Sequence, residues 1–174
     1  MATLEPYKDA RPQVHPDAYV HEDATLIGDV VVGAEASIWP AAVLRGDDGP
    51  IRIGALTSIQ DGSVVHTTRG QSEVNVGARC TVGHKVILHG CTVEDDCLIG
   101  MGAILLDGAV IGRGSLVGAG ALVTQNKVIP PGSLVLGSPA RVVRPCGDKE
   151  RAQIEHGWRE YQERGREYRE RDAQ

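Results

Sequence analysis

Aliphatic residues recur at every sixth position along most of this chain. A period of six matches neither the 3.6-residue turn of a helix nor the two-residue alternation of an open strand. It is typical of a solenoid in which short strands and turns alternate three times in each coil. The sequence therefore predicts an all-β solenoid, a left-handed parallel β-helix of hexapeptide repeats. The repeating positions are Val14, Val20, Leu26, Val32, Ile38 and Leu44, and later Val93, Ile99, Leu105, Ile111, Val117, Val123, Ile129 and Val135.

Small residues accompany the aliphatic positions in two ways. Ala, Ser or Cys often stands four residues later, as at Ala24 and Ser115, where a larger side chain would collide with its neighbours. Gly often follows the aliphatic residue directly, as at Gly54, and we expect it to relax the turn backbone. Phe is absent and aromatic residues make up 3% of the chain. This composition suits a narrow interior of stacked aliphatic side chains.

The repeat divides the chain into three parts. Residues 1–13 precede it and form an N-terminal extension. Residues 14–145 form the β-helix domain, which we expect to have about seven coils. Residues 146–174 lack the repeat and are predicted to form a C-terminal α-helix packed on the solenoid.

The C-terminal segment carries its apolar residues at helical spacing. Ile154, Trp158 and Tyr161 would lie on one face of a helix and cover a wall of the β-helix. Gly157 and Gly165 weaken this prediction, because each glycine costs a helix about 1 kcal/mol relative to alanine.

Charge and hydropathy indicate which partners to expect. The formal net charge is −5, so the composition does not predict a nucleic-acid partner. No apolar run is long enough to span a membrane, and the N-terminus lacks the basic region and apolar core of a signal peptide. We therefore expect a cytoplasmic protein that binds neither nucleic acid nor membrane.

Three histidines lie where the six-residue repeat is interrupted. An insertion spans residues 45–50, a polar loop spans residues 67–75 after His66, and a step of the repeat is shortened around His84 and His89. Three imidazoles that leave a fourth coordination position open are typical of a catalytic zinc site. Scattered polar surface residues are the alternative interpretation of the same histidines.

The register of the coils decides whether the histidines can meet. With matching corners in adjacent coils, His66 and His89 lie on one face, about 4.8 Å apart along the stacking direction, and His84 lies on a different face. A second copy of the chain would have to supply His84, and three copies around a threefold axis would build three equivalent sites. A register with a corner at position 71 would break this stacking and stays open. The corners used are Ile53, Ile59 and Val65 in one coil and Val76, Val82 and Ile87 in the next.

At these positions the sequence resembles the gamma-class carbonic anhydrase family. The resemblance implies that His66, His84 and His89 bind Zn²⁺, or Fe²⁺ or Co²⁺ in its place. It also implies that His84 comes from the adjacent subunit of a homotrimer. The segments that carry the resemblance are Leu44-Arg45-Gly46-Asp47, Ile59-Gln60-Asp61, His66, Gly83-His84, His89-Gly90-Cys91 and Ile99-Gly100-Met101-Gly102-Ala103.

The resemblance also implies roles for residues around the metal. Arg45 and Asp47 would form an ion pair across or near the subunit interface, for which a purely structural bridge is the alternative. Gln60 would lie beside the metal-bound solvent. Asp48 stands where the well-studied enzymes have a glutamate thought to help activate water. Tyr161 corresponds to a tyrosine that approaches the site from the C-terminal helix.

The function implied by the resemblance is hydration of carbon dioxide to bicarbonate. The chain has Arg69 where the family's proton-shuttle glutamate stands, so we expect modest, buffer-dependent turnover. We expect Asp61 to bond turn amides. Three alternatives remain open: a metal-dependent thioesterase acting on acyl-CoA, a hexapeptide acyltransferase acting on a small acyl substrate, and a non-catalytic metal- or siderophore-binding protein.

Overall fold

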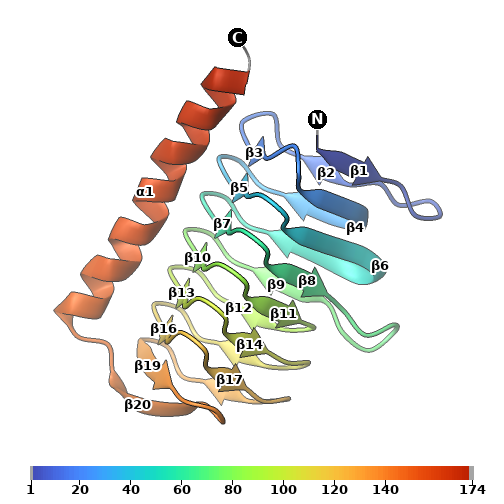
Figure 1. Cartoon of the computed structure of the whole chain (residues 1–174). Helices are drawn as coiled ribbons and strands as arrows, with labels where there is room; N and C mark the ends of the chain where they lie inside the picture. The colour runs from blue at the N-terminus through green and yellow to red at the C-terminus, as the bar shows by residue number, and fades with distance from the viewer. Residues whose placement is uncertain (1, 173–174) are drawn as a thin grey trace.

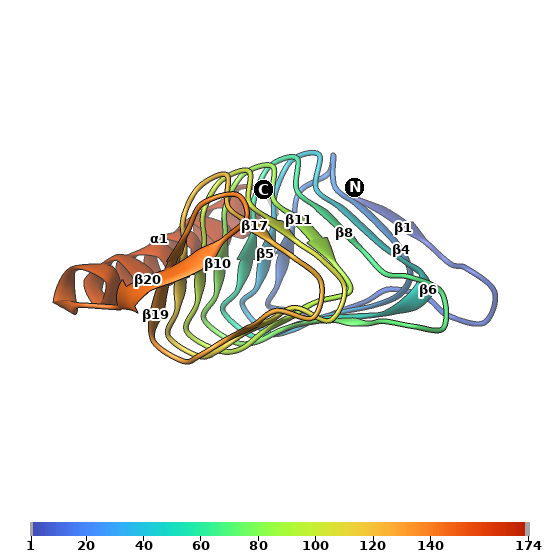
Figure 2. The same cartoon turned by 90° about the horizontal axis from the view of Figure 1, so that it is seen from below.

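The computed structural model describes residues 2–172 and shows a parallel β-solenoid of about seven turns followed by one helix (Figure 1). Seen along the solenoid axis, the coils superimpose on a roughly triangular outline, with the helix along one wall (Figure 2). The predicted fold class is confirmed.

Within residues 2–172 the strands form two sheets, one of twelve strands and one of eight. The larger sheet covers two walls of the triangle, because the long strands β4 and β6 continue from one wall to the next. Its strands are β1 (Thr3–Glu5), β2 (Gln13–Val14), β4 (Thr25–Val32), β6 (Val43–Ile53), β8 (Val64–His66), β9 (Val74–Val76), β11 (Ile87–His89), β12 (Thr92–Val93), β14 (Ile104–Leu105), β15 (Val110–Ile111), β17 (Leu122–Val123) and β18 (Val128–Ile129). The smaller sheet comprises β3 (Tyr19–Val20), β5 (Ser37–Ile38), β7 (Ser58–Ile59), β10 (Thr81–Val82), β13 (Leu98–Ile99), β16 (Leu116–Val117), β19 (Ser133–Leu136) and β20 (Arg141–Pro145).

Aliphatic side chains stack in columns inside the solenoid and form its core. In one column, each side chain is 0% exposed and pairs in register with its counterpart in the next coil; its members are Leu26, Leu44, Val65, Leu88, Leu105 and Val123. Burial of these residues stabilises the fold by roughly 1.5–3 kcal/mol for each fully buried aliphatic side chain.

The predicted corner at Ile87 is wrong. Leu88 is the interior residue, whereas the side chain of Ile87 is on the outer surface and Ile87 is 38% exposed. The six-residue step is kept from Val82 to Leu88, so the missing residue falls between Leu88 and Val93. The insertion after β8 lies at a corner, as expected, and the register with a corner at position 71 is not adopted.

The glycine that follows an aliphatic residue does not act as we expected. Gly54 does not adopt the left-handed backbone conformation, which is found two positions later at Leu56 (φ 63°). A Cβ atom at Gly54 would lie 2.4 Å from the carbonyl carbon of Gly77 in the next coil. This glycine therefore permits close stacking of coils rather than a relaxed turn.

Helix α1 (Asp148–Asp172) packs along the smaller sheet and contacts β10, β7, β5 and β3. At Gly157 and Gly165 the backbone of the helix lies close to the sheet. A Cβ atom would lie 2.8 Å from Thr81 Oγ1 at Gly157 and 3.3 Å from Ser37 Cβ at Gly165. The two glycines that weaken an isolated helix therefore allow this helix to lie against the sheet.

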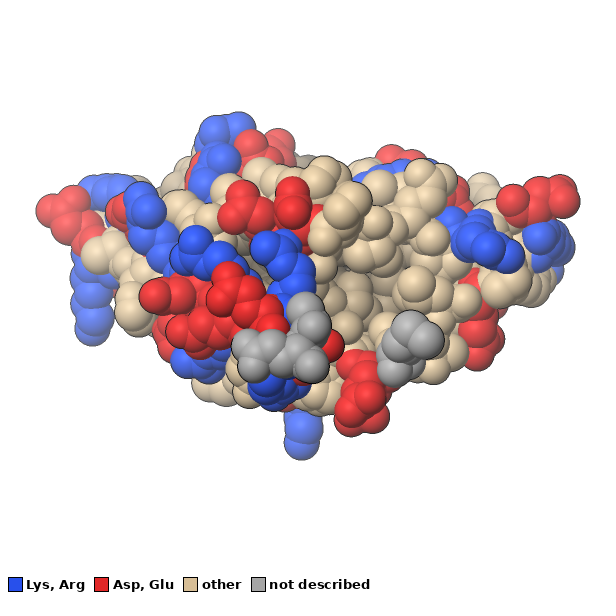
Figure 3. All heavy atoms as spheres, turned by 90° about the horizontal axis from the view of Figure 1, so that it is seen from above, with Lys and Arg blue, Asp and Glu red and all other residues tan. Residues whose placement is uncertain are grey.

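Charged side chains of both signs are interspersed on the face at the N-terminal end of the solenoid, with a broad uncharged region between them (Figure 3). No extended patch on this face carries charges of only one sign. None of the helices within residues 2–172 combines the length and apolar character needed to cross a bilayer.

Candidate metal centre

His66 and His89 end strands β8 and β11 and stack in register on the outer surface of adjacent coils. Their ring centroids are 5.3 Å apart, and His66 Nδ1 lies 3.4 Å from His89 Nε2. The predicted stacking of these two side chains is confirmed.

An aspartate contacts the other nitrogen of each ring. His66 Nε2 lies 3.2 Å from Asp47 Oδ1, and His89 Nδ1 lies 2.9 Å from Asp107 Oδ2. An ionised carboxylate accepts hydrogen bonds only, so in a neutral imidazole the proton lies on the nitrogen that faces the aspartate. The two nitrogens that face each other are then both unprotonated, and neither can donate to the other.

The spacing of these two nitrogens fits a tetrahedral metal ion. Two ligands of a tetrahedral zinc site with Zn–N bonds of about 2.0–2.1 Å are separated by roughly 3.3–3.4 Å. The measured separation between His66 Nδ1 and His89 Nε2 is 3.4 Å. Two unprotonated nitrogens at this spacing can both bind one cation, and the aspartates behind them are typical of histidine ligands.

Asp107 is a site residue that we did not predict from the sequence. Besides His89, its carboxylate contacts Ser72, whose Oγ donates to Asp107 Oδ1 over 2.6 Å. Burial raises the pKa of Asp107, but the hydrogen bonds from Ser72 and His89 outweigh it and hold the pKa below its usual value. The sequence offered one indication of this role: Asp107 lies at the turn that stacks, one coil further on, against the turn following His89.

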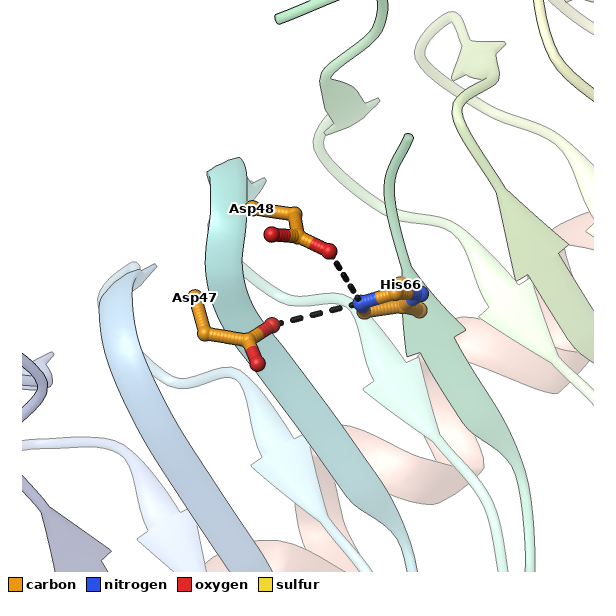
Figure 4. Close-up of side chains that lie close together, drawn as sticks. All are labelled: Asp47, Asp48 and His66. Atoms are coloured by element: carbon orange, nitrogen blue, oxygen red, sulfur yellow. Dashed lines mark hydrogen bonds and ion pairs between the residues drawn. The ribbon is translucent and has the colours of Figure 1, made fainter. Parts of the chain in front are cut away.

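Asp47, Asp48 and His66 form a compact group at the bend of β6 (Figure 4). One ligand atom from each residue lies within 4.8 Å of the other two, and Asp48 Oδ2 is 3.7 Å from His66 Nε2. Arg45 Nη1 donates to both oxygens of Asp47, at 2.7 and 3.0 Å. Burial raises the pKa of Asp47, but the Arg45 guanidinium has the larger opposite effect, so the pKa of this carboxyl group lies below its usual value. The ion pair of Arg45 and Asp47 thus forms within one chain.

Arg69, in the loop after β8, reaches back to this group. Its Nε donates to Asp48 Oδ1 over 2.6 Å, while its side chain is 71% exposed. A positive charge therefore lies beside Asp48, and it comes from the sequence position at which the family resemblance would place a proton-shuttle glutamate.

The remaining predicted residues lie together elsewhere on the chain. His84 Nδ1 is 2.9 Å from Asp61 Oδ2, so Asp61 contacts an imidazole, whereas we expected it to bond turn amides. Both residues line a cavity of about 370 Å³ together with Tyr161. Gln60, which is 4% exposed, directly precedes Asp61. One chain therefore separates the predicted site residues into a group around His66 and His89 and a group around His84, as the register argument predicted.

Sequence comparison connects this geometry with known proteins. The family described as "Bacterial transferase hexapeptide (six repeats)" matches residues 90–125. YrdA of Escherichia coli (strain K12) is 45% identical over 164 residues, which cover 91% of this chain and 89% of that protein. A carbonic anhydrase of Geobacillus kaustophilus is 46% identical over 163 residues, covering 94% and 89% of the two chains.

A solved structure agrees with the sequence comparison. The product of the BC4754 gene of Bacillus cereus superimposes with a TM-score of 0.94 at 43% identity, covering 96% of both chains. Identity above 40% over nine tenths of the chain is found both with a protein named carbonic anhydrase and with a protein without that name. The chain therefore belongs to the hexapeptide-repeat family, among its gamma-carbonic-anhydrase-like members.

Proposed function

We propose that this chain is a metal-dependent carbonic anhydrase that hydrates carbon dioxide to bicarbonate at a three-histidine site completed between copies of the chain. One observation carries the proposal: His66 Nδ1 and His89 Nε2 lie 3.4 Å apart, and an aspartate contacts the other nitrogen of each ring. Similarity to the Geobacillus kaustophilus carbonic anhydrase supports it.

His84 of a second copy would be the third ligand. Its Nδ1 contacts Asp61, which leaves Nε2 as the unprotonated nitrogen, as in His89, whereas in His66 the unprotonated nitrogen is Nδ1. The His84 side chain is half exposed and lies away from His66 and His89 of its own chain. Three such contacts around a threefold axis would close a homotrimer with three equivalent sites.

An apolar strip beside the histidine pair favours this self-association. The outward side chains two residues before His66 and His89 are Val64 and Ile87, and these residues are 39% and 38% exposed. Half-buried aliphatic residues continue the strip in register to both sides, at Val43, Ile104 and Leu122. Exposed aliphatic residues next to an incomplete ligand set are what a shared interface would cover.

The donor set also bears on the choice of metal. Imidazole nitrogens suit Zn²⁺ and also Fe²⁺ and Co²⁺, and protein ligands alone do not select among these ions. When bound, zinc lowers the pKa of a coordinated water to about 7 and so supplies a nucleophile for carbon dioxide at neutral pH.

The residues around the pair would control protons and orientation. Arg45 immobilises Asp47, which in turn orients the ring of His66. Asp48 is the second carboxylate near this ring, but it is bound by Arg69. A proton leaving the site therefore meets a positive charge, so we expect turnover to depend on buffer. Gln60 and Tyr161 would be contributed by the copy that supplies His84.

The shared site can be tested by mixing two inactive variants. His84→Ala and His89→Ala should each lose the metal, because two imidazoles bind zinc far more weakly than three. When the two are unfolded, mixed and refolded, about a quarter of the sites on a threefold ring pair an intact His66 and His89 with an intact His84. Metal content and carbon dioxide hydration should both recover to that level. Mixed trimers, verified by mass, that recover neither would contradict the intersubunit site.

A second candidate is acyl transfer, which is favoured by the description of the matching family as a bacterial transferase hexapeptide. Assaying the metal-loaded protein with carbon dioxide and with acyl-CoA, with and without an acceptor, separates these functions. Metal bound at about one ion per chain without any turnover would instead favour a metal-binding protein.

A further inference from the structure

A directed chain of hydrogen bonds lies behind His89. Asp107 Oδ2 lies 2.9 Å from His89 Nδ1, and Ser72 Oγ lies 2.6 Å from Asp107 Oδ1. The backbone N–H of Thr68 donates to Ser72 Oγ over 2.9 Å. These hydrogen bonds therefore connect the imidazole of His89 to the backbone of the loop that follows His66.

The chemistry of the groups sets the direction of every bond in this chain. The N–H of Thr68 can only donate, so Ser72 Oγ accepts from it and directs its own proton to Asp107. An ionised carboxylate can only accept, so His89 must donate from Nδ1. His89 Nε2 is then left with its lone pair, directed at His66.

We propose that Asp107 is a positioning residue that fixes the tautomer of His89, and that Ser72 makes this depend on the conformation of the 67–75 loop. The proposal rests on the proposed function, because it concerns the histidine that would bind the metal. It assigns roles to two residues outside the predicted site and gives the loop a part in metal binding.

The backbone at Gly90 is shaped around the same two side chains. Gly90 has a positive φ of 61°, and a Cβ atom there would lie 2.0 Å from Asp107 Oδ1 and 2.4 Å from Ser72 Oγ. Only glycine leaves this space free directly after His89. The hydrogen bonds of Asp107 and Ser72 therefore require glycine at this turn.

Asp107 also differs from Asp47, the aspartate that contacts His66. Asp47 is shared between His66 and the guanidinium of Arg45. Among the described residues, no Lys or Arg forms an ion pair with Asp107. The negative charge of Asp107 therefore acts on His89, and its removal should change which ring nitrogen of His89 carries the proton.

The test uses Asp107→Asn, which keeps the size of the side chain and removes its charge. Zinc affinity of the metal-free protein, measured by competition with a chromophoric chelator, should fall about 10- to 100-fold. Ser72→Ala should weaken binding by a smaller factor, and by no further factor in the Asp107→Asn background. Asp96→Asn is the matched control, because it removes an aspartate that holds Arg79 over 2.6 Å, and it should bind zinc normally.

A second readout does not depend on metal. In the metal-free protein, ¹⁵N shifts of the His89 ring should show the proton on Nδ1, and Asp107→Asn or Ser72→Ala should give a mixture of tautomers. A wild-type ring protonated on Nε2, or an Asp107→Asn protein that binds zinc as well as Asp96→Asn, would overturn the proposal.

These measurements distinguish failure of the proposed metal centre from failure of the positioning role of Asp107. If His66→Ala and His89→Ala bind zinc as tightly as the wild type, the metal centre is wrong, and the tautomer measurement still judges Asp107. If both lose zinc while Asp107→Asn keeps it, the metal centre stands and the positioning role falls.

Discussion

Replacing Gly157 by alanine should destabilise the protein although alanine is the better helix former. Alanine stabilises a helix interior by about 1 kcal/mol relative to glycine. At this position the new Cβ atom would lie 2.8 Å from Thr81 Oγ1, well inside van der Waals contact. Overpacking of this kind costs about 1–3 kcal/mol, so the net change should lie between about zero and 2 kcal/mol of destabilisation.

The sign should reverse when the opposing side chain is shortened. In the Thr81→Ala background the closest remaining atom is Thr81 Cβ, 3.5 Å away, which is an ordinary contact. The Thr81 hydroxyl is buried without a hydrogen-bond partner, so removing it breaks no bond. Gly157→Ala should then stabilise by about 1 kcal/mol, which gives a coupling energy of about 1–3 kcal/mol between the two positions.

Denaturant unfolding of the four proteins at one fixed protein concentration measures this cycle, because assembly would make stability depend on concentration. Gly165→Ala is a useful comparison, since its Cβ atom would meet Ser37 Cβ at 3.3 Å and should be tolerated better. Equal effects of Gly157→Ala in both backgrounds would refute the argument that close contact with Thr81 selects glycine.

Three further predictions concern the helix junction and the site. The hydrogen bonds from Arg144 lower the pKa of Glu150 to about 2, so their stabilisation is complete above the usual value of 4.5 and is lost as pH falls toward 2. Glu150→Gln should remove that part of the acid dependence of the unfolding midpoint; an unchanged profile would contradict it. Arg69→Glu replaces the cation paired with Asp48 by a carboxylate and should make carbon dioxide hydration less sensitive to buffer concentration in stopped-flow assays. Gly90→Ala should weaken zinc binding at least as much as loss of the side chains it would displace, as judged by chelator competition.

The interior of the solenoid could be predicted because it obeys one simple repeat. Each aliphatic position must fill the same narrow space in every coil, so the spacing of Leu44 and Val65 from their neighbours defines the register. That register placed His66 and His89 together and His84 apart. These conclusions depend on the backbone alone.

The details that were missed depend on side chains meeting across coils. A shortened repeat does not show which corner loses the residue, so Ile87 was expected inside in place of Leu88. Asp61 and Asp107 orient histidines across long stretches of sequence, and no local pattern marks such a pair. Gly157 conflicts with helix propensity, and only the surface opposite it explains the conflict.

The path of helix α1 has a consequence for how the protein unfolds. A stack of coils that touch only their neighbours can melt gradually from its ends. Here Ile154 packs beside the last coils, while Gln162 donates to Glu35 and Arg169 donates to the carbonyl of Asp17 in the first coils. The helix therefore contacts both ends of the stack, so fraying at either end also costs contacts with the helix. We therefore expect the protein to unfold in one sharp transition, and we expect the unfolding transition to broaden when helix α1 is removed.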